Sequence, residues 1–345
     1  MSTVIYFHTL NSIGGVETWL YNLALKHNFT FYYKKGDPVQ IKRLSQLIPV
    51  KKYNGERIKC DRFIVNYNPD IIDNVDAKEY IMMIHCDYNA VHFNPIMHPK
   101  ITKYIGVSKY VCDVFTELTG VPAEVMYNPV YVSGEQKKKK GLHLISATRL
   151  TSEKGGWRID KMSEMLDKAG VQYTWDIYTN RNCHFTSKNV HRKLPKLDLS
   201  KEIAESTYLV QLSDAEAFCL SVVESLMLNT PVIITDLPVY KELGITDKHA
   251  IRVDKNLEDV DIDKIVNSEF KFKYEPPKSD WSKYLDKKGN YNPLEKVEIE
   301  VLSKKLWLIE EDAHLLRGDK IKVSRVRASE LEAKGYAIIN YNSIL

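Results

Sequence analysis

The segment between residues 208 and 235 constrains the fold of this chain more than any other. An apolar run over 208–212 predicts a buried strand, and the loop that follows it carries Glu216. A helix is expected over about 221–229, and 232–235 is again an apolar run. Strand, loop, helix and strand make a βαβ unit, and such units build parallel sheets whose ligand sites lie at the carboxyl ends of the strands. The sequence therefore predicts a ligand site at the acidic loop.

The same plan is visible at the amino terminus. A strand is expected over 4–8, followed by a turn that contains Gly14 and Gly15 and by a helix over 16–26. Glycines between a strand and a helix suit a ligand that approaches backbone amides, although a plain tight turn would look the same. The GxGxxG fingerprint of dinucleotide-binding domains is absent.

The plan restarts after residue 141. A strand over 142–150 ends beside Arg149, a loop with Lys154 follows, and a helix is expected over 157–169. Two successive α/β halves of similar plan imply two Rossmann-like domains that face each other across a cleft.

The chain of 345 residues is long enough for two domains and a small appendage. We expect an amino-terminal domain over 1–135 and a second domain over 141–290, joined at the lysine run 137–140. The short β segments and helix expected over 294–345 predict a small α+β appendage. It is about the smallest unit that could fold alone, so we expect it to lean on something larger and to serve oligomerisation or targeting.

Composition excludes several classes of protein. A content of 44% apolar and 27% charged residues is that of an ordinary globular protein, and a net charge of +4 permits an anionic ligand without indicating nucleic acid. The five cysteines are scattered without a CxxC pair, which favours reduced thiols in the cytoplasm over disulfides or a zinc site. We expect no signal peptide, and no apolar stretch approaches the roughly 20 residues of a membrane span.

Cationic and amide groups are expected near the acidic loop. The guanidinium group of Arg149 can donate two parallel hydrogen bonds, and the ammonium group of Lys154 provides a compact positive charge. Together they can pair with a diphosphate. The first amides of the helix after Glu216 are free donors at the positive end of the helix dipole. His85 follows a strand expected over 80–84. We expect no metal site, because His85, His92 and His98 are not spaced as metal ligands on a helix would be.

The two glutamates of the loop and helix differ in their explanations. Ser221 to Glu224 reads S-x-x-E, a capping box in which the glutamate bonds the amide of the cap residue. A capping glutamate and a ligand-binding glutamate would look identical there. Glu216 lies in the loop beside Ala and Phe, outside any charge run, and we interpret it as functional.

These motifs resemble a known enzyme family. The segments that carry the resemblance are 14–18 (GGVET), 147–155 (ATRLTSEKG) and the E-x7-E motif from Glu216 to Glu224. The chain is similar to GT-B glycosyltransferases of the large retaining, GT4-like group (glycosyl transferases group 1), from Val4 to about Tyr284. The resemblance implies an α/β GT-B fold, a UDP- or GDP-sugar as cosubstrate, and no obligatory metal or other cofactor.

The resemblance also implies roles for individual residues. Arg149 and Lys154 would neutralise the leaving diphosphate, and Glu216 would contact sugar hydroxyls near the anomeric carbon. Glu224 would bind the ribose hydroxyls, and His85 would lie near the sugar. The remaining donor-binding residues that it implies are Gly14, Gly15, Phe218, Cys219, Leu220 and Ser221. Fixed cations and amides of this kind stabilise the negative charge that develops on the diphosphate.

The sequence departs from the family pattern in places. Ala217 stands where the family usually has Gly, and Asn229 replaces a Gly after the helix, where Asn tolerates the left-handed conformation. Residues 294–345 lie outside the family and are faintly similar to small phage-encoded modules. That similarity would suit an enzyme that works in the cytoplasm of a phage host.

Three functions remain open from the sequence. The first is a retaining glycosyltransferase whose acceptor is a glycan, a cell-wall polymer, a protein or a modified DNA base. The second is a GT-B sugar-nucleotide epimerase, which would need acid and base carboxylates that the sequence does not identify. The third is a non-catalytic sugar-nucleotide or glycan-binding protein whose carboxyl-terminal module does the work.

Overall fold

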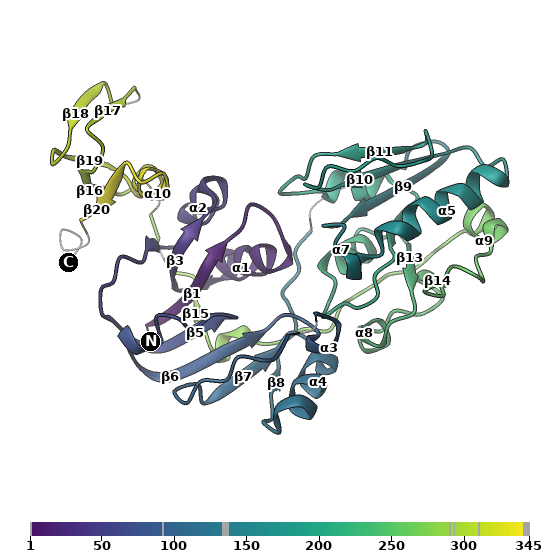
Figure 1. Ribbon diagram of the computed structural model, residues 1–345, viewed down its shortest axis with the longest axis horizontal. Helices are drawn as coiled ribbons and strands as arrows, with labels where there is room; N and C mark the ends of the chain where they lie inside the picture. Colours follow the sequence, from purple (N-terminus) through teal and green to yellow (C-terminus); the bar gives the residue numbers. More distant parts are fainter. Residues whose placement is uncertain are drawn as a thin grey trace. The chain divides into compact units, whose positions relative to one another are not determined.

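The computed structural model describes residues 2–91, 93–132, 138–289, 291–292, 294–309 and 311–340. The chain forms two compact units (Figure 1). Unit 1 contains Met1–Ile84, Ile96–Ile105 and Asp280–Leu345, and unit 2 contains His85–Pro95 and Gly106–Ser279. The expected linker at 137–140 lies partly outside the described residues, since 133–137 are not described.

The central sheet of unit 1 is built on the apolar run at the amino terminus. Its strands follow the spatial order β4 (Val50–Lys52), β3 (Thr30–Gly36), β1 (Thr3–Leu10), β5 (Ile58–Asn66), β6 (Val75–Ile84) and β7 (Lys103–Gly106). From β4 to β6, neighbouring strands pair in parallel. The first five residues of β1 are buried, as expected for a parallel strand that is covered on both faces.

The strand order of unit 1 reverses between β1 and β5. The chain builds outward from β1 through β3 to β4, then returns to the other side of β1 and builds outward through β5 to β7. Helix α1 (Gly15–Lys26) follows β1, and α2 (Pro38–Ser45) follows β3. In open α/β sheets, ligands bind outside the carboxyl ends of the strands at such a reversal.

After unit 2 the chain returns to unit 1 at Asp280. The ring of Trp281 meets that of Trp19 edge-on at 5.7 Å, and the carbonyl oxygen of Tyr284 accepts a hydrogen bond from Arg62 Nη1 at 2.6 Å. These contacts group residues 280 onward with unit 1, whereas we expected one domain over 141–290. Trp281 begins a single 3-10 turn. The short elements on this path are the 3-10 turn η3 (Trp281–Lys283) and the paired strands β2 (His27–Asn28) and β15 (Asp286–Lys287).

The carboxyl-terminal module is the expected small α+β appendage. Strands β19, β16 and β20 form an antiparallel sheet, β17 and β18 form a hairpin, and α10 packs on the sheet around Val297, Ile299, Val323 and Leu331. The sequence did not predict β18. The bounds are β16 (Lys296–Val301), β17 (Lys305–Leu308), β18 (Ala313–Leu316), β19 (Lys320–Ser324), α10 (Arg325–Ala333) and β20 (Ala337–Ile339).

The module docks on β4 and α2 of unit 1 through a buried carboxylate. Glu332 on α10 is 2% exposed. Its Oε2 accepts a hydrogen bond from the Lys52 amide of β4 at 3.0 Å, and its Oε1 accepts one from the Ile339 amide of β20 at 3.2 Å. Helix α10 thereby covers an edge strand whose open amides would otherwise pair with another chain.

Unit 2 contains a second parallel sheet. Its spatial strand order is β11 (Val190–Lys193), β10 (Tyr173–Tyr178), β9 (Leu142–Ala147), β12 (Tyr208–Gln211), β13 (Val232–Thr235) and β14 (Ala250–Val253). All neighbouring pairs are parallel. The order reverses between β9 and β12, so the reversal point of this unit lies next to the acidic loop. The expected fold class, mixed α/β with two parallel-sheet domains, is confirmed.

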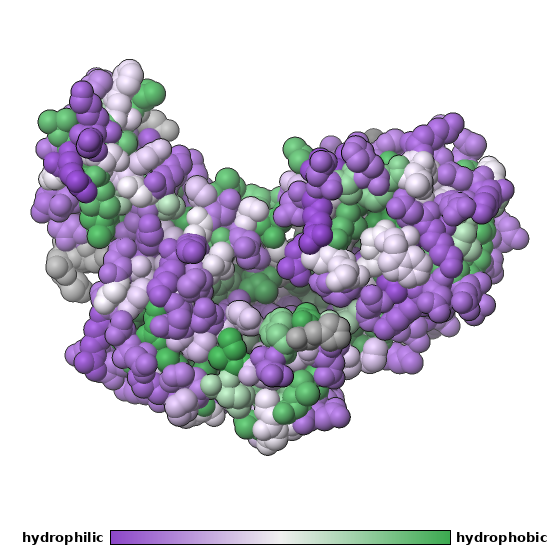
Figure 2. All heavy atoms as spheres, viewed as in Figure 1, coloured by the Kyte–Doolittle hydropathy of each residue, from purple (hydrophilic) through white to green (hydrophobic). Residues whose placement is uncertain are grey.

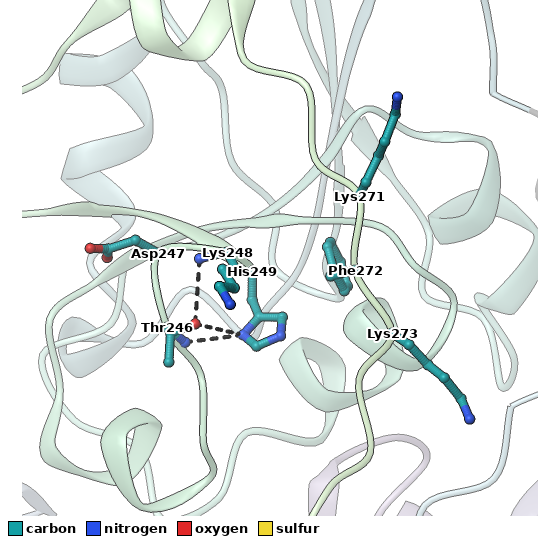
Figure 3. A pocket seen from close by; sticks show the side chains of 7 residues that line it. All are labelled: Thr246, Asp247, Lys248, His249, Lys271, Phe272 and Lys273. Carbon is teal, nitrogen blue, oxygen red and sulfur yellow. Dashed lines mark hydrogen bonds between the residues drawn. The ribbon is translucent and has the colours of Figure 1, made fainter.

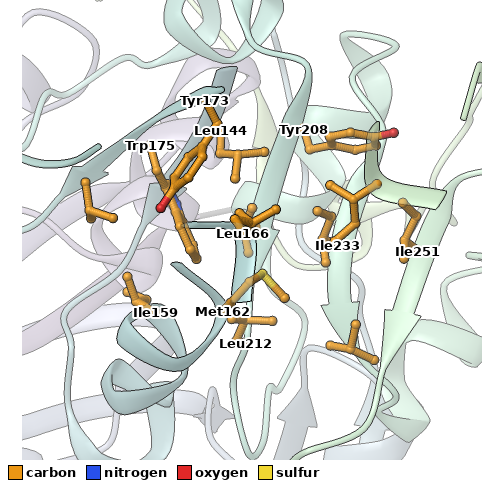
Figure 4. Close-up of a cluster of buried hydrophobic side chains, with 14 of the residues drawn as sticks. Leu144, Ile159, Met162, Leu166, Tyr173, Trp175, Tyr208, Leu212, Ile233 and Ile251 are labelled. Atoms are coloured by element: carbon orange, nitrogen blue, oxygen red, sulfur yellow. The ribbon is translucent and has the colours of Figure 1, made fainter. Parts of the chain in front are cut away.

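Helices cover the second sheet and complete the unit. Met162 and Leu166 of α5 pack toward Leu144, Trp175 and Tyr208 of the strands (Figure 4). The remaining elements are α3 (Tyr88–Val91), α4 (Lys109–Thr119), β8 (Glu124–Val125), α5 (Gly156–Lys168), α6 (Ser200–Glu205), α7 (Leu220–Met227), α8 (Pro238–Glu242), α9 (Ile262–Asn267) and the 3-10 turns η1 (Ile72–Asn74, in unit 1) and η2 (Ser152–Lys154).

The visible surface is mostly hydrophilic, with hydrophobic residues in small groups (Figure 2). One group lies on the β17–β18 hairpin and its turn, where Trp307, Ile309 and Leu316 are exposed. Within the described residues, no helix combines the length and apolarity needed to cross a bilayer.

Replacing Glu332 with Gln should destabilise the protein by about 1–3 kcal/mol, because the amide group of Gln cannot accept from both backbone N–H groups. Urea unfolding followed by circular dichroism measures the change. Glu298→Gln is the matched control, since Glu298 lies in the same module but pairs with the exposed Lys320 of that module at 3.6 Å, and its loss should cost under about 1 kcal/mol. Equal losses for the two variants would contradict the docking role of Glu332.

Candidate functional site

The carboxyl ends of β9 and β12 bring two predicted site residues together. Lys154 ends the 3-10 turn η2 after β9, and Glu216 lies in the loop after β12. The Nζ of Lys154 donates to Glu216 Oε1 at 2.7 Å, and the two side chains are only 15% and 9% exposed. Residues 62 positions apart in sequence therefore meet at the reversal point of the unit 2 sheet.

Two further side chains hold the Glu216 carboxylate. Gln211 Nε2 donates to Oε1 at 3.0 Å, and Ser213 Oγ donates to it at 2.7 Å. Three donors therefore converge on one oxygen of the Glu216 side chain. Sequence reasoning missed both residues; the available signal was a glutamine inside an otherwise apolar strand, where a polar side chain needs a buried partner.

The ammonium group of Lys154 is kept charged. Burial lowers the pKa of Lys154, but the charges of Glu216 and Cys219 and the hydrogen bond to Glu216 together outweigh that effect, and the net result is a raised pKa. The attraction within a largely buried ion pair offsets the cost of desolvation only when hydrogen bonds satisfy the remaining polar groups. Gln211 and Ser213 each donate one such hydrogen bond to Glu216. The site thus holds a fixed cation beside a fixed anion.

The loop with Glu216 is fastened by Arg158 of α5. The guanidinium of Arg158, 3% exposed, donates to the Leu212 carbonyl at 3.0 Å and to Asp214 Oδ1 at 2.5 Å. Its Nε donates to the carbonyl of Lys255, which follows β14. Arg158 therefore fixes the beginning of the loop between β12 and Glu216, a role that the sequence did not reveal.

Gly155 lets α5 approach this loop. Its φ is 62°, and a Cβ at this position would lie 2.1 Å from the Leu212 carbonyl oxygen and 2.3 Å from Arg158 Nη1. Both the left-handed backbone and the missing side chain are required here.

The start of α7 corrects one prediction. The helix begins at Leu220 and its N-cap is Cys219, whose φ of 64° is left-handed and which makes no side-chain cap bond. Ser221 therefore lies inside the first turn, and the expected capping box from Ser221 to Glu224 is wrong. The expected left-handed conformation of Asn229 is present, with φ 52°.

Glu224 consequently loses its structural explanation as a cap. It lies half-buried on α7, and burial, followed by the charge of Asp198, raises the pKa of Glu224 to about 7. Near neutral pH, Glu224 is then a mixture of carboxyl and carboxylate and can donate as well as accept hydrogen bonds.

Ser108 contacts the same loop. It caps α4, accepting from the Val111 amide at 3.3 Å. Its hydroxyl also donates to the Ala217 carbonyl at 2.6 Å, next to Glu216. The two bonds use the hydroxyl both as acceptor and as donor.

The other predicted residues come from other segments of the chain. Arg149 is exposed, after β9. His85 follows β6, and burial lowers the pKa of His85 to about 3, so the imidazole is neutral. Gly14 and Gly15 belong to unit 1. A Cβ added to Gly14 would lie 2.4 Å from the carboxylate of the buried Glu17, so that carboxylate occupies the space of a side chain at this position.

Two other features of the described residues were compared with this site: groups of possible metal ligands and a surface hollow of unit 2. In the described part of the chain, no group of three or more His, Cys, Asp or Glu residues could hold a metal ion; His92 is not described. A hollow of about 720 Å³ lies at the amino end of β14, where Phe272 faces His249 (Figure 3). It lies at the sheet edge opposite the carboxyl ends that carry Glu216, and its lining residues are Thr246, Asp247, Lys248, His249, Lys271, Phe272 and Lys273.

Comparison with known proteins identifies the fold. No family model matches the chain, and no curated protein matches its sequence. Among solved structures, Anabaena HepE in complex with UDP and glucose is similar over 74% of this chain and 86% of its own, with 13% identity and a TM-score of 0.59. The lipopolysaccharide outer core galactosyltransferase WaaB is similar over 77% and 90%, with 13% identity and a TM-score of 0.53. This chain spans only 45% of TarM, with 14% identity and a TM-score of 0.47. The fold is GT-B, as the sequence predicted.

Gly155→Ala should destabilise the protein by more than about 3 kcal/mol, since the added methyl group collides with the Leu212 carbonyl and with Arg158. Gly170→Ala is the matched control: its φ is also left-handed, at 68°, but no atom lies within 4 Å of the added Cβ, so only the backbone cost of about 1 kcal/mol applies. Urea unfolding of the two variants measures the difference. Similar losses would mean that α5 does not approach the loop as described.

Proposed function

We propose that this chain is a retaining, GT4-like glycosyltransferase that moves a sugar from a UDP- or GDP-sugar to an acceptor hydroxyl. The observation that carries the proposal is the contact between Lys154 and Glu216 at the carboxyl ends of β9 and β12. Lys154 supplies a fixed cation for a diphosphate, and Glu216 supplies a fixed anion for sugar hydroxyls. One hydrogen bond joins these two side chains.

Lys154 and its neighbours would stabilise the leaving diphosphate. Breaking the bond between the anomeric carbon and the diphosphate oxygen leaves negative charge on the diphosphate and positive charge on the sugar. The raised pKa of Lys154 keeps its charge available, and the exposed Arg149 on the same loop would add a second cation. The amides of Phe218, Cys219, Leu220 and Ser221 would add donors, because no side chain caps the start of α7.

Glu216 would contact the sugar near the anomeric carbon. Its Oε1 is held by Lys154, Gln211 and Ser213, while none of the described residues donates to Oε2. A carboxylate that is anchored through one oxygen can present the other to sugar hydroxyls without reorganising, as electrostatic preorganisation requires.

Other residues complete the proposed donor site. Glu224 would bind the ribose hydroxyls, and its pKa of about 7 lets it accept or donate there. His85 would lie near the sugar as a neutral imidazole, and Gly14 and Gly15 would lie below the donor phosphates. The similar HepE structure contains UDP and glucose, which favours UDP as the nucleotide.

The remaining features fit a cytoplasmic enzyme with an attached module. All five cysteines are unpaired thiols, as in a reducing compartment. The amino-terminal Rossmann-like domain would bind the acceptor, and residues 294–345 would serve oligomerisation or targeting. The proposal requires no metal.

Nucleotide sugars should raise the melting temperature. A donor present at about 100 times its Kd stabilises the folded state by about 2.7 kcal/mol, and UDP-glucose, UDP-N-acetylglucosamine, UDP-galactose and GDP-mannose are the compounds to screen. Thermal unfolding followed by dye fluorescence measures the shift. Lys154→Met should remove the shift, and free glucose should give none. No shift with any nucleotide sugar would overturn the proposed function.

Glu216→Gln should lower sugar transfer by about 100-fold or more while the protein stays folded, because the neutral amide cannot stabilise the charged transition state. Release of UDP from the donor identified by the thermal screen measures activity. Glu202→Gln is the control, since Glu202 forms a comparable lysine pair with Lys196 on the surface of α6 and should behave like the wild type. Full activity of Glu216→Gln would refute its assigned role.

A further inference from the structure

Unit 1 contains a cluster of titratable side chains that the proposed donor site does not use. Asp70 Oδ1 accepts a hydrogen bond from the Tyr6 hydroxyl at 2.7 Å. Asp70 Oδ2 lies 3.1 Å from His8 Nδ1 and also pairs with Lys34 Nζ. The side chains of His8, Lys34 and Asp70 are 34%, 36% and 23% exposed, so solvent reaches each of them.

This cluster spans the reversal point of the unit 1 sheet. His8 lies near the carboxyl end of β1 and Lys34 near that of β3, and Asp70 lies in the loop after β5. Because strand order reverses between β1 and β5, the contact between His8 and Asp70 bridges the two strand ends at which an open α/β sheet binds ligands.

Hydrogen bonding sets the tautomer of His8. Burial raises the pKa of Asp70, but hydrogen bonds from Lys34, Tyr6 and His8 outweigh burial and lower it, so Asp70 is an acceptor. In the neutral imidazole, Nδ1 then carries the proton that is donated to Asp70, and Nε2 carries a lone pair. None of the described residues donates to this Nε2, so a ligand hydroxyl can do so.

The loop that positions Asp70 adds an exposed aromatic ring. Tyr67 has a left-handed φ of 65°, which is costly for a bulky side chain, and it is 47% exposed. Asn68 shapes the rest of the loop: its amide donates to the Asn66 carbonyl at 2.8 Å, and its Oδ1 accepts from the Asp70 amide at 3.1 Å. An aromatic face next to hydrogen-bonding groups matches a sugar ring, which has apolar faces and a rim of hydroxyls.

The charges of the cluster favour a neutral ligand over a polyanion. The exposed Asp70 carboxylate would repel the phosphates of a nucleic acid, and the cation nearest to it, Lys34, is already paired with it. A purely structural role, tying the loop to β1, would be served by the Tyr6 hydroxyl and by Lys34 without an imidazole.

We propose that His8, backed by Asp70, binds the acceptor, and that the acceptor is a carbohydrate. The Nε2 of His8 accepts a hydrogen bond from a hydroxyl of the acceptor sugar, and Tyr67 lies against the sugar ring. This inference rests on the proposed glycosyltransferase function, because it assigns the acceptor of that reaction. It involves binding alone and no proton transfer.

The test measures sugar binding without any donor. The probes are the methyl α- and β-glycosides of glucose, galactose and mannose, and binding is measured by saturation-transfer difference NMR. We expect the wild type to bind at least one of them and His8→Ala to bind it about tenfold more weakly, the factor that corresponds to one lost hydrogen bond. Lys35→Ala, an exposed change next to Lys34 in sequence, should bind as the wild type does.

Further measurements separate binding from folding and from the donor reaction. His8→Gln keeps hydrogen-bonding capacity and serves if His8→Ala does not fold. In the folded variant, the donor-induced thermal shift and the hydrolysis of the donor by water should match those of the wild type, which a general structural defect would not allow. The ring nitrogen signals of His8, assigned with the variants, should show a proton on Nδ1 and should shift when the glycoside is added.

Two results would overturn the inference. One is a wild-type protein that binds none of the glycosides, which would point to a protein or nucleic-acid acceptor. The other is a His8 variant that binds the glycoside as tightly as the wild type. Both are distinct from a failure of the proposed function, which would appear as the absence of any thermal shift with nucleotide sugars.

Discussion

The hydrogen-bonded ion pair between Lys154 and Glu216 depends on a loop that is held by contacts from two helices. Arg158 holds the beginning of that loop from α5, and Ser108 holds its far side at the Ala217 carbonyl. Gly155 makes the close approach of α5 possible because it has no side chain and accepts a left-handed backbone. A carboxylate and an ammonium group with low exposure remain near each other only when the surrounding structure fixes both. The fixed hydrogen bonds around the two side chains thus offset the cost of burying their charges. A charged pair that is fixed in this way would also suit a charged substrate.

The two parallel sheets place polar groups at corresponding points. In unit 2 the reversal of strand order lies between β9 and β12, and Lys154 and Glu216 follow those strands. In unit 1 it lies between β1 and β5, and His8 and Asp70 occupy the matching positions. At such a reversal the connecting chains leave in opposite directions, so the strand ends stay open to ligands. The same topology therefore positions a charged pair in one unit and a histidine–aspartate pair in the other.

The carboxyl-terminal module shows how an appendage too small for a large core can be ordered. It has an apolar cluster of its own around Val297 and Ile299, but its helix α10 also covers the edge strand β4. Glu332 satisfies one amide on β4 and one on β20, which a hydrophobic side chain could not do. The exposed Trp307 and Ile309 of the β17–β18 hairpin lie outside this docking contact.

Local sequence determined much of the fold and part of the site. Apolar runs predicted β1 and β12, because a strand buried on both faces needs apolar residues at successive positions. Asn229 was assigned correctly, since a preference for the left-handed conformation is a property of a single residue. Only the tertiary structure decided the rest. The start of α7 depends on the conformation of Cys219, and the supports of Glu216 come from Gln211, Ser213 and Arg158, whose roles require contacts across the sheet. The return of residues 280–288 to unit 1 and the bond from Lys52 to Glu332 join segments hundreds of residues apart. Such contacts leave no periodic signal in the sequence, because the partner of a polar side chain is fixed by chain topology and not by its neighbours.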